Sequence, residues 1–205
     1  MGSKQYIVPA DLMTISDMKE YRVGALAAGV KRCWDKAIGT PCTDWESLTL
    51  ADTKTKIAGK DWPSQLDVFE FQNIAHAGAN LDQWNTAALA AVGSSYSVFQ
   101  AISAPAANLR MNKIVVFYGI MIEETPNPVS RLTFRRNNAT GITIAEFDLE
   151  SLGTMEKQMG FFSEPVVIDN NVSFAAQVMA RIATGAAARV QLMNFIFEPA
   201  GTSHQ

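Results

Sequence analysis

The segment VSFAAQVMARI, Val172 to Ile182, decides the fold class of this chain. Every second residue from Val172 onward is apolar, and Ser173, Gln177 and Arg181 occupy positions between them. A period of two residues is typical of a strand with one face on a core and the other in solvent. The segment therefore predicts a half-buried β-strand.

Similar strands are predicted through most of the last hundred residues. Asn137 to Gly141 and Ala183 to Gly185 separate them with residues that favour tight turns. Connections this short favour antiparallel pairing, and helix-length crossovers are missing after residue 112, which argues against a parallel α/β sheet. The predicted strands are 65–72, 96–102, 112–123, 130–136, 142–149, 164–168, 172–182 and 188–198.

One long helix is predicted before the strands, from Ser16 to Ile38, with Gly39 as its stop signal. Its expected apolar face consists of Val23, Leu26, Ala27, Val30, Cys33, Trp34 and Ala37. Small residues at Gly24, Ala25, Ala28 and Gly29 would let another element approach closely. The helix either packs on its own domain, or reaches a neighbouring subunit or a membrane surface.

The remainder of the first half is less regular. Pro41 to Pro63 is polar and loop-like, and a short helix is predicted through Leu81 to Val92 with Asp82 as its cap. We expect two parts, residues 1–62 as an N-terminal helix and extended arm and residues 63–205 as a β-sandwich. The predicted fold class is mainly β: an antiparallel jelly-roll sandwich of about eight strands with one N-terminal α-helix.

Composition narrows the possible functions. The 205 residues are 48% hydrophobic and 18% charged, with a formal net charge of −3. This is enough apolar surface for a core, but it gives no global attraction to phosphate, so direct sequence-specific nucleic-acid binding is not expected. The uncharged stretch 83–109 contains too many polar residues for a membrane span, and Met1 to Pro9 has no continuous apolar core, so we expect a soluble chain without a secretory signal.

Residues equipped for catalysis are scarce. His204 is one residue from the end, and His76 lies among small residues, where an ordinary polar loop residue is favoured over a base or ligand. Cys33 and Cys42 permit a disulfide, but two idle thiols are the favoured interpretation, and a zinc site that combined them with His76 would need unconvincing spacing. Signatures of nucleophiles and phosphate-binding loops are absent from the sequence. We therefore expect no enzyme, no catalytic residues, no cofactor and no metal.

Charged groups are expected at the surface. Asp148 and Glu150, like Glu123 and Glu124, are interpreted as strand-end acids and not as an acid/base pair. The main basic grouping predicts a solvated strand face or a subunit contact. It consists of Arg131, Arg135 and Arg136.

Three segments carry a resemblance to a known family: Pro128 to Phe134, Phe162 to Val167, and Arg189 to Pro199. With the N-terminal helix and the overall length, residues 112–199 resemble the single-jelly-roll capsid proteins of tailless, internal-membrane-containing icosahedral phages. The resemblance implies a capsid subunit that self-assembles into the icosahedral shell, located in the virion after assembly in the host cytoplasm. Its implied partners are further copies of the chain, other capsid proteins and an internal viral membrane. The single basic residue among the first sixteen, Lys4, fits a shell separated from its genome by lipid.

Two other classes of function stay open. A non-enzymatic binding module, such as a phage attachment protein or a carbohydrate-binding β-sandwich, would use Trp45, Trp62 and Trp84 as a sugar-stacking platform in predicted loops. A small β-barrel enzyme is the least favoured class because histidine and cysteine are scarce.

Overall fold

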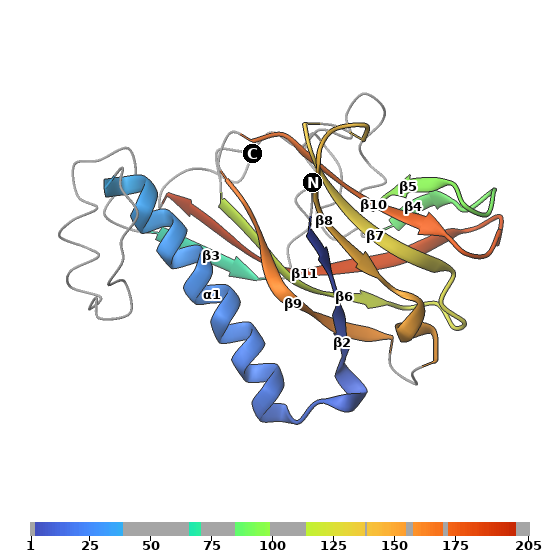
Figure 1. The fold of residues 1–205 in the computed structure, drawn as a ribbon, viewed down its shortest axis with the longest axis horizontal. Helices are drawn as coiled ribbons and strands as arrows, with labels where there is room; N and C mark the ends of the chain where they lie inside the picture. The colour runs from blue at the N-terminus through green and yellow to red at the C-terminus, as the bar shows by residue number, and fades with distance from the viewer. Residues whose placement is uncertain are drawn as a thin grey trace.

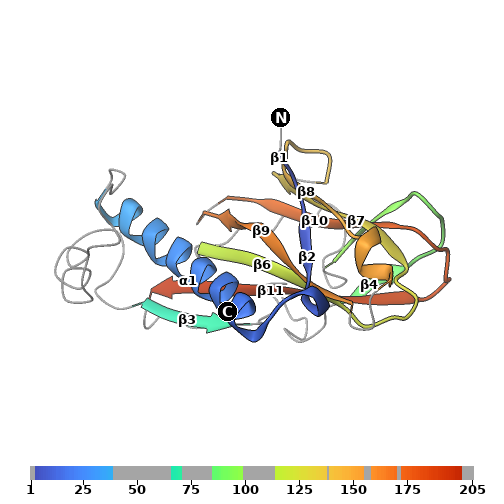
Figure 2. The same cartoon turned by 60° about the horizontal axis from the view of Figure 1, so that its bottom comes forward.

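The computed structural model describes residues 3–38, 66–70, 85–98, 114–137, 139–154, 158–169 and 172–199. Within these ranges the chain is mainly β, with two sheets and one long helix (Figure 1). The helix, α1 (Ile15–Ile38), crosses the outer face of one of the two sheets (Figure 2).

The larger sheet has the spatial order β2, β9, β6, β11, β3, and β4 pairs with β11 beside this path. All of its neighbouring strands pair antiparallel. The strands are β2 (Ile7–Pro9), β9 (Met159–Ile168), β6 (Ile114–Ile122), β11 (Ala187–Pro199), β3 (Leu66–Glu70) and β4 (Asn85–Ala88).

The smaller sheet has the spatial order β1, β8, β7, β10, β5. Its pairs are antiparallel except that β1 runs parallel to β8. The strands are β1 (Ser3–Gln5), β8 (Thr143–Asp148), β7 (Val129–Arg136), β10 (Phe174–Ala180) and β5 (Ser95–Ser97). Two short 3-10 helices, η1 (Ala10–Leu12) and η3 (Glu150–Thr154), follow β2 and β8.

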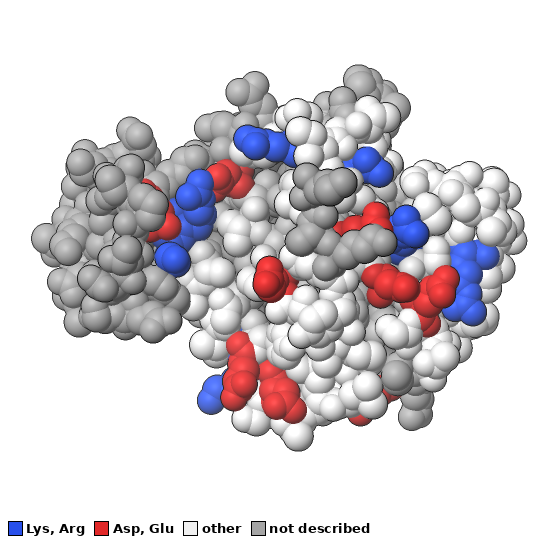
Figure 3. All heavy atoms as spheres, viewed as in Figure 1, with Lys and Arg blue, Asp and Glu red and all other residues white. Residues whose placement is uncertain are grey.

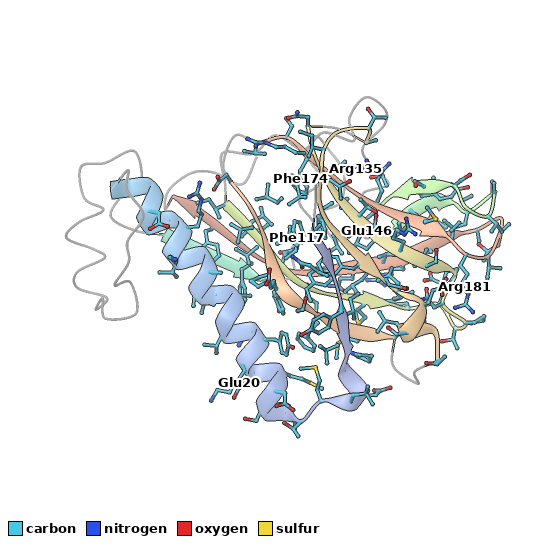
Figure 4. All side chains as sticks on the ribbon, in the orientation of Figure 1. Glu20, Phe117, Arg135, Glu146, Phe174 and Arg181 are labelled. Carbon is cyan, nitrogen blue, oxygen red and sulfur yellow. The ribbon has the colours of Figure 1, made fainter. Side chains whose placement is uncertain are left out.

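Aromatic side chains fill the space between the two sheets. Ring centroids of Phe147 and Phe162 lie 4.0 Å apart, and those of Phe117 and Phe134 lie 5.0 Å apart. Figure 4 shows Phe117 and Phe174 within the body of the molecule, and all five of these side chains are fully buried. Because apolar burial is the main favourable term in folding, this cluster holds the sheets together as a β-sandwich.

A second apolar cluster lies between α1 and the outer face of the larger sheet. The strands contribute large rings, among them Tyr118, Phe161 and Phe197. The helix contributes the buried residues Ala25 and Cys33, with Met18, Tyr21 and Val30 packed against them. A Cβ atom added to Gly29 would lie 2.0 Å from Cε2 of Phe197, so at this position only glycine leaves room for the ring. The helix and the opposite sheet together cover both faces of β6, which explains its nearly continuous apolar sequence.

The predicted apolar face of the helix is therefore wrong in part. Val23 is 52% exposed and Leu26 is 37% exposed, and Ala25, which was not assigned to that face, is buried against the sheet. Cys33 and Val30 of the predicted face do lie in or against the cluster under the helix. Part of the reason is steric, because the helix approaches the sheet closely enough at Gly29 to exclude a side chain beside Phe197. Of the two alternatives for the helix, the structure shows that it packs on its own domain, and the structure does not test a further contact through the exposed face.

Other expectations differ from the structure in extent. The helix predicted through Leu81 to Val92 is wrong where the structure describes it, because residues 85–88 form β4 and the following residues form a loop. Residues 3–9 form two strands where an extended arm was predicted, and β9 begins at Met159, before the predicted 164–168. The predicted division at residue 62 falls outside the described ranges and stays a prediction.

Candidate functional site

A polar groove of about 210 Å³ lies on the outer face of the smaller sheet. Three carboxylates against one guanidinium give its lining a net charge of −2 (−3 + 1). The charged groups that surround it are visible in Figure 3. The lining residues are Gln5, Ser130, Arg131, Glu146, Asp148 and Glu150.

Several of these charged side chains already form ion pairs or hydrogen bonds with neighbouring groups of the protein. Nη1 of Arg131 lies 3.7 Å from Oε1 of Glu146, with both side chains partly exposed. Oδ1 of Asp148 accepts a hydrogen bond of 2.8 Å from the backbone N–H of Glu150, which fixes the start of η3. These contacts agree with the interpretation of Asp148 and Glu150 as strand-end acids. What remains open to a ligand is a shallow surface with hydrogen-bond acceptors.

A second depression, of about 310 Å³, lies between α1 and the end of β9. Arg32 donates two hydrogen bonds to the carboxylate of Asp169, from Nε and from Nη2, across this space. The hydrogen bonds with Asp169 raise the pKa of Arg32 above its usual value. This bidentate ion pair links the helix to the end of β9. The depression is therefore interpreted as part of the contact between helix and sheet, and not as a ligand site.

Cys33 has the environment of an inert thiol. Its side chain is fully buried and forms no disulfide, and Cys42 lies outside the described residues. Burial raises the pKa of the Cys33 thiol to about 12. Because the thiolate is the nucleophile, Cys33 is unsuited to nucleophilic chemistry at neutral pH.

The predicted basic grouping lies along β7. Arg131 pairs with Glu146, and Arg136 is exposed. Nη1 of Arg135 donates a 3.2 Å hydrogen bond to the carbonyl oxygen of Gly141 in the turn that follows. Arg131 and Arg136 are thus solvated, as one of the two predicted roles has it, whereas Arg135 is half-buried, and the subunit contact stays a prediction.

The acids at the end of β6 also have structural partners. Glu123 Oε2 lies 3.3 Å from Nη1 of Arg189. The backbone N–H of Arg189 donates a hydrogen bond to Oε1 of Glu124. These two acids therefore tie β6 to the start of β11, as expected for acids at a strand end.

Several predicted candidates lie outside the described residues. They are His76, His204, Cys42, Trp45, Trp62 and Trp84. Among the residues that the structure does describe, no group of three His, Cys, Asp or Glu side chains could hold a metal ion. In the same ranges, no helix combines the length and the apolar character needed to cross a bilayer.

Sequence reasoning missed three exposed side chains with large apolar parts: Tyr6 between β1 and β2, Leu12 at the end of η1, and Ile15 at the start of α1. Tyr6 is 67% exposed, Leu12 is 71% exposed and Ile15 is 85% exposed. The available signal was the presence of Leu12 and Ile15 beside the polar residues of a helix start. Comparison of the chain with protein-family models, curated proteins and solved structures gave no match.

Proposed function

We propose that this protein is a structural subunit of a viral shell, built as a jelly roll, that self-assembles through its outer surfaces. The observation that carries the proposal is the order of the strands. A jelly roll is a long antiparallel hairpin of eight strands folded over into two sheets, so its first strand pairs with its last, and each later strand pairs inward in the same way.

Eight strands of this chain fit that pattern when β3 is taken as the first and β11 as the last. β3 pairs with β11, β5 with β10, β6 with β9, and β7 with β8, all antiparallel. The pairs then alternate between the two sheets in sequence order. This nested pairing supports a jelly roll over a meander or an up-and-down barrel, in which neighbours along the chain would pair.

A jelly roll alone does not decide function, because lectin domains, cupin enzymes and capsid proteins share it. The packed interior favours a structural role, because phenylalanine rings fill the space between the sheets where a cupin would hold its site. The outer surface adds support, because large apolar side chains such as Ile15 and Ile142 are mostly exposed. Such side chains mark a binding surface where they stand together in one patch, as Leu12 and Ile15 do at the start of the helix.

On this proposal the partners are further copies of the chain and other capsid proteins, and the location is the virion after assembly in the host cytoplasm. One face of α1 packs against the larger sheet, so exposed residues of the helix such as Ile15 and Val23 are the ones available to a membrane or a neighbouring subunit. The single lysine of the N-terminal strand, Lys4, is consistent with a shell that does not touch its genome.

The proposal is tested by the mass of the purified protein across a series of protein and salt concentrations. Light scattering should show discrete large species, and negative-stain images should show regular oligomers or shell-like particles. A monomer under every condition, including after addition of lipid vesicles, would contradict the proposal.

A binding module is the second candidate, favoured by the polar groove on the smaller sheet. Its acceptors, among them the carboxylate of Glu146, suit the hydroxyl groups of a carbohydrate. Specific signals on a glycan array that are lost in Glu146→Gln and kept in Glu164→Gln would support this function. Signals that instead depend on Trp84 would support binding through the predicted loop platform.

A further inference from the structure

One end of the molecule combines exposed apolar groups with negative charge. We name it the helix-start corner and define it by Tyr6, Leu12, Ile15, Asp17 and Glu20. The three apolar side chains are each at least two-thirds exposed, at 67%, 71% and 85%. Both acids are also exposed. A surface of this kind is costly to leave in water and is typical of a binding site for another macromolecule.

Hydrogen bonds and packing hold the helix-start corner in place. The carboxylate of Asp17 accepts hydrogen bonds from the backbone N–H and the hydroxyl of Thr14, at 2.8 and 2.7 Å, and the backbone N–H of Asp17 donates to that hydroxyl. These reciprocal bonds form a cap on α1. Ala10, just before the cap, is buried in the cluster under the helix, and Met13 packs against that cluster. The corner is therefore a preformed surface.

The cations near this corner do not balance its acids. Asp11, Asp17 and Glu20 carry three negative charges, against two positive charges on Lys19 and on Arg22, whose guanidinium lies over the ring of Phe195, 5.7 Å from its centroid. Figure 3 shows acidic side chains at the lower edge of the molecule, where α1 begins. A negative, apolar surface is unfavourable for an anionic lipid headgroup and favourable for a basic, apolar protein surface.

The end of the β7–β8 hairpin has the opposite character. We name it the hairpin end and define it by Arg135, Arg136 and Ile142. Ile142 is 68% exposed, and the described residues from Arg135 to Thr143 contain no carboxylate. The backbone N–H of Arg136 donates a 2.8 Å hydrogen bond to the carbonyl of Ile142, and the backbone N–H of Asn137 donates to Ser173, so this surface is also preformed.

The two surfaces lie at opposite ends of the same molecule. Figure 4 shows Glu20 at the lower end and Arg135 near the upper end, and the hairpin and the start of α1 also lie far apart in Figure 2. One copy cannot bring its own helix-start corner to its own hairpin end, but a second copy can supply the missing surface. Contact between two different surfaces of identical chains is heterologous, and it builds rings or open rows.

We propose that copies of this chain associate head to tail, with the helix-start corner of one copy bound to the hairpin end of the next. The inference rests on the proposed function, because it names the contact through which the shell subunit forms its oligomers. In this contact Leu12 and Ile15 cover Ile142, and the acids of one copy face the arginines of the other. A closed ring of such contacts would be the assembly unit of the shell.

The test is a charge swap. Glu20→Arg and Arg136→Glu each place like charges across the contact, and Glu20→Arg/Arg136→Glu restores opposite charges. Both side chains are exposed, so substitution should leave folding unaffected. Each single variant should raise the concentration for half-maximal oligomer formation at least tenfold, and the double variant should return it to within about threefold of wild type.

Matched controls carry the same charge changes elsewhere on the surface. Glu164→Arg on β9 and Arg181→Glu after β10 alter exposed residues outside both surfaces and should assemble like the wild type. Sedimentation velocity at several protein concentrations gives the readout, and circular dichroism confirms that each variant is folded.

The outcomes separate this inference from the proposed function. If the wild type assembles and both single variants assemble equally well, the head-to-tail contact is wrong and the shell function stands. If the wild type forms no oligomer under any condition, both fail. Flotation with 3:1 phosphatidylcholine:phosphatidylglycerol vesicles that is abolished by Ile15→Ser, with assembly unchanged, would assign the corner to lipid and overturn the inference.

Discussion

Gly24 and Gly29 lie on the same helix but in opposite environments. A Cβ added to Gly24 meets no atom within 4 Å, whereas one added to Gly29 would lie 2.0 Å from Cε2 and 2.2 Å from Cζ of Phe197. Alanine gains about 1 kcal/mol over glycine in a helix interior. We therefore expect Gly24→Ala to raise the free energy of unfolding by about 0.5–1 kcal/mol. Gly29→Ala should lower it by about 1–2 kcal/mol, because displacement of a buried ring outweighs that gain.

Urea unfolding of the two variants and the wild type measures this difference, with each variant serving as the control for the other. If both substitutions stabilise the protein, the ring of Phe197 does not occupy the space at Gly29, and α1 lies farther from the sheet.

Ionisation of the Cys33 thiol should lower the free energy of unfolding at alkaline pH. Burial raises its pKa to about 12 in the folded protein, from an unperturbed value of 9.0. A raised folded-state pKa stabilises the protein below the unfolded-state pKa, and that stabilisation is lost as the pH rises through the folded-state pKa. We expect the free energy of unfolding to fall between about pH 9 and pH 12 more steeply in the wild type than in Cys33→Ala.

Thiol labelling provides a second measurement for Cys33. At pH 8 the native protein should leave this thiol unlabelled by an aromatic disulfide reagent, and urea should make it react. Cys42→Ala serves as the background, so that Cys33 alone is observed. Rapid labelling of the native variant, together with equal pH slopes for wild type and Cys33→Ala, would show that Cys33 is accessible.

At the scale of elements, the sequence predicts those strands in which apolar residues recur with a period of two and turn residues stand at the ends. The predicted 112–123 contains β6, and the predicted 188–198 matches β11 closely. Strands that depend on distant partners were missed. β1 and β2 have three residues each, too few for a period to show, and they form because β8 and β9 offer edges far along the chain.

The error at β4 has a similar cause. Its alanine-rich sequence favours a helix on propensity alone, which is why one was predicted through Leu81 to Val92. In the structure Ala88 pairs with Ala187, and the backbone N–H of Leu89 donates to the carbonyl of Ala186. Long-range hydrogen bonds to β11 therefore outweigh the local preference, which no short window of sequence reveals.

The helix is also a structural part of the sandwich. Removal of residues 1–38 would uncover Tyr118, Phe161 and Phe197 on the outer face of the larger sheet, together with two sheet edges. We expect this truncated chain to aggregate or to bind a hydrophobic dye strongly, because its exposed apolar patch would be large.

The matched control changes only the outward face of the helix. Val23→Ser should stay within about 0.5 kcal/mol of the wild type in stability, because half of this side chain is already exposed to water. A truncated chain that folds and stays monodisperse would show that α1 is a detachable arm, which is the role the sequence left open for it.

At the scale of the whole molecule, the candidate binding surfaces were less predictable from the sequence than the fold. Arg131, Asp148 and Glu150 were recognised as surface charges, but only the sheet brings them together with Gln5, through the parallel pairing of β1 with β8. The exposure of Ile15, and the position of Arg135 at the other end of the molecule, likewise become known only from the three-dimensional structure. Periodicity identifies which residues face a core, but it does not identify which exposed residues share a surface.

The architecture predicts a gradient of local stability from the centre to the edges. β6 pairs with β9 and β11 and is covered on one face by α1 and on the other by the opposite sheet, whereas β1 and β5 are three-residue edge strands with one neighbour each. Amides of β6 and of the middle of β11 should therefore exchange with solvent deuterium only through global unfolding. Those of β1 and β5 should exchange about a thousandfold faster or more, through local opening.

Hydrogen exchange of the monomer, followed by mass spectrometry, measures this gradient, and Gly29→Ala adds a directional check. If the helix shields the sheet as a docked layer, that substitution should speed exchange in β6 and β11 and leave β7 and β10, in the other sheet, less affected. Equal protection in β1 and β6 would contradict a cover over the larger sheet. The amides of β6 could also exchange slowly in the wild type and at the same rate in Gly29→Ala. That result would show that the core between the two sheets protects β6, without a contribution from the helix.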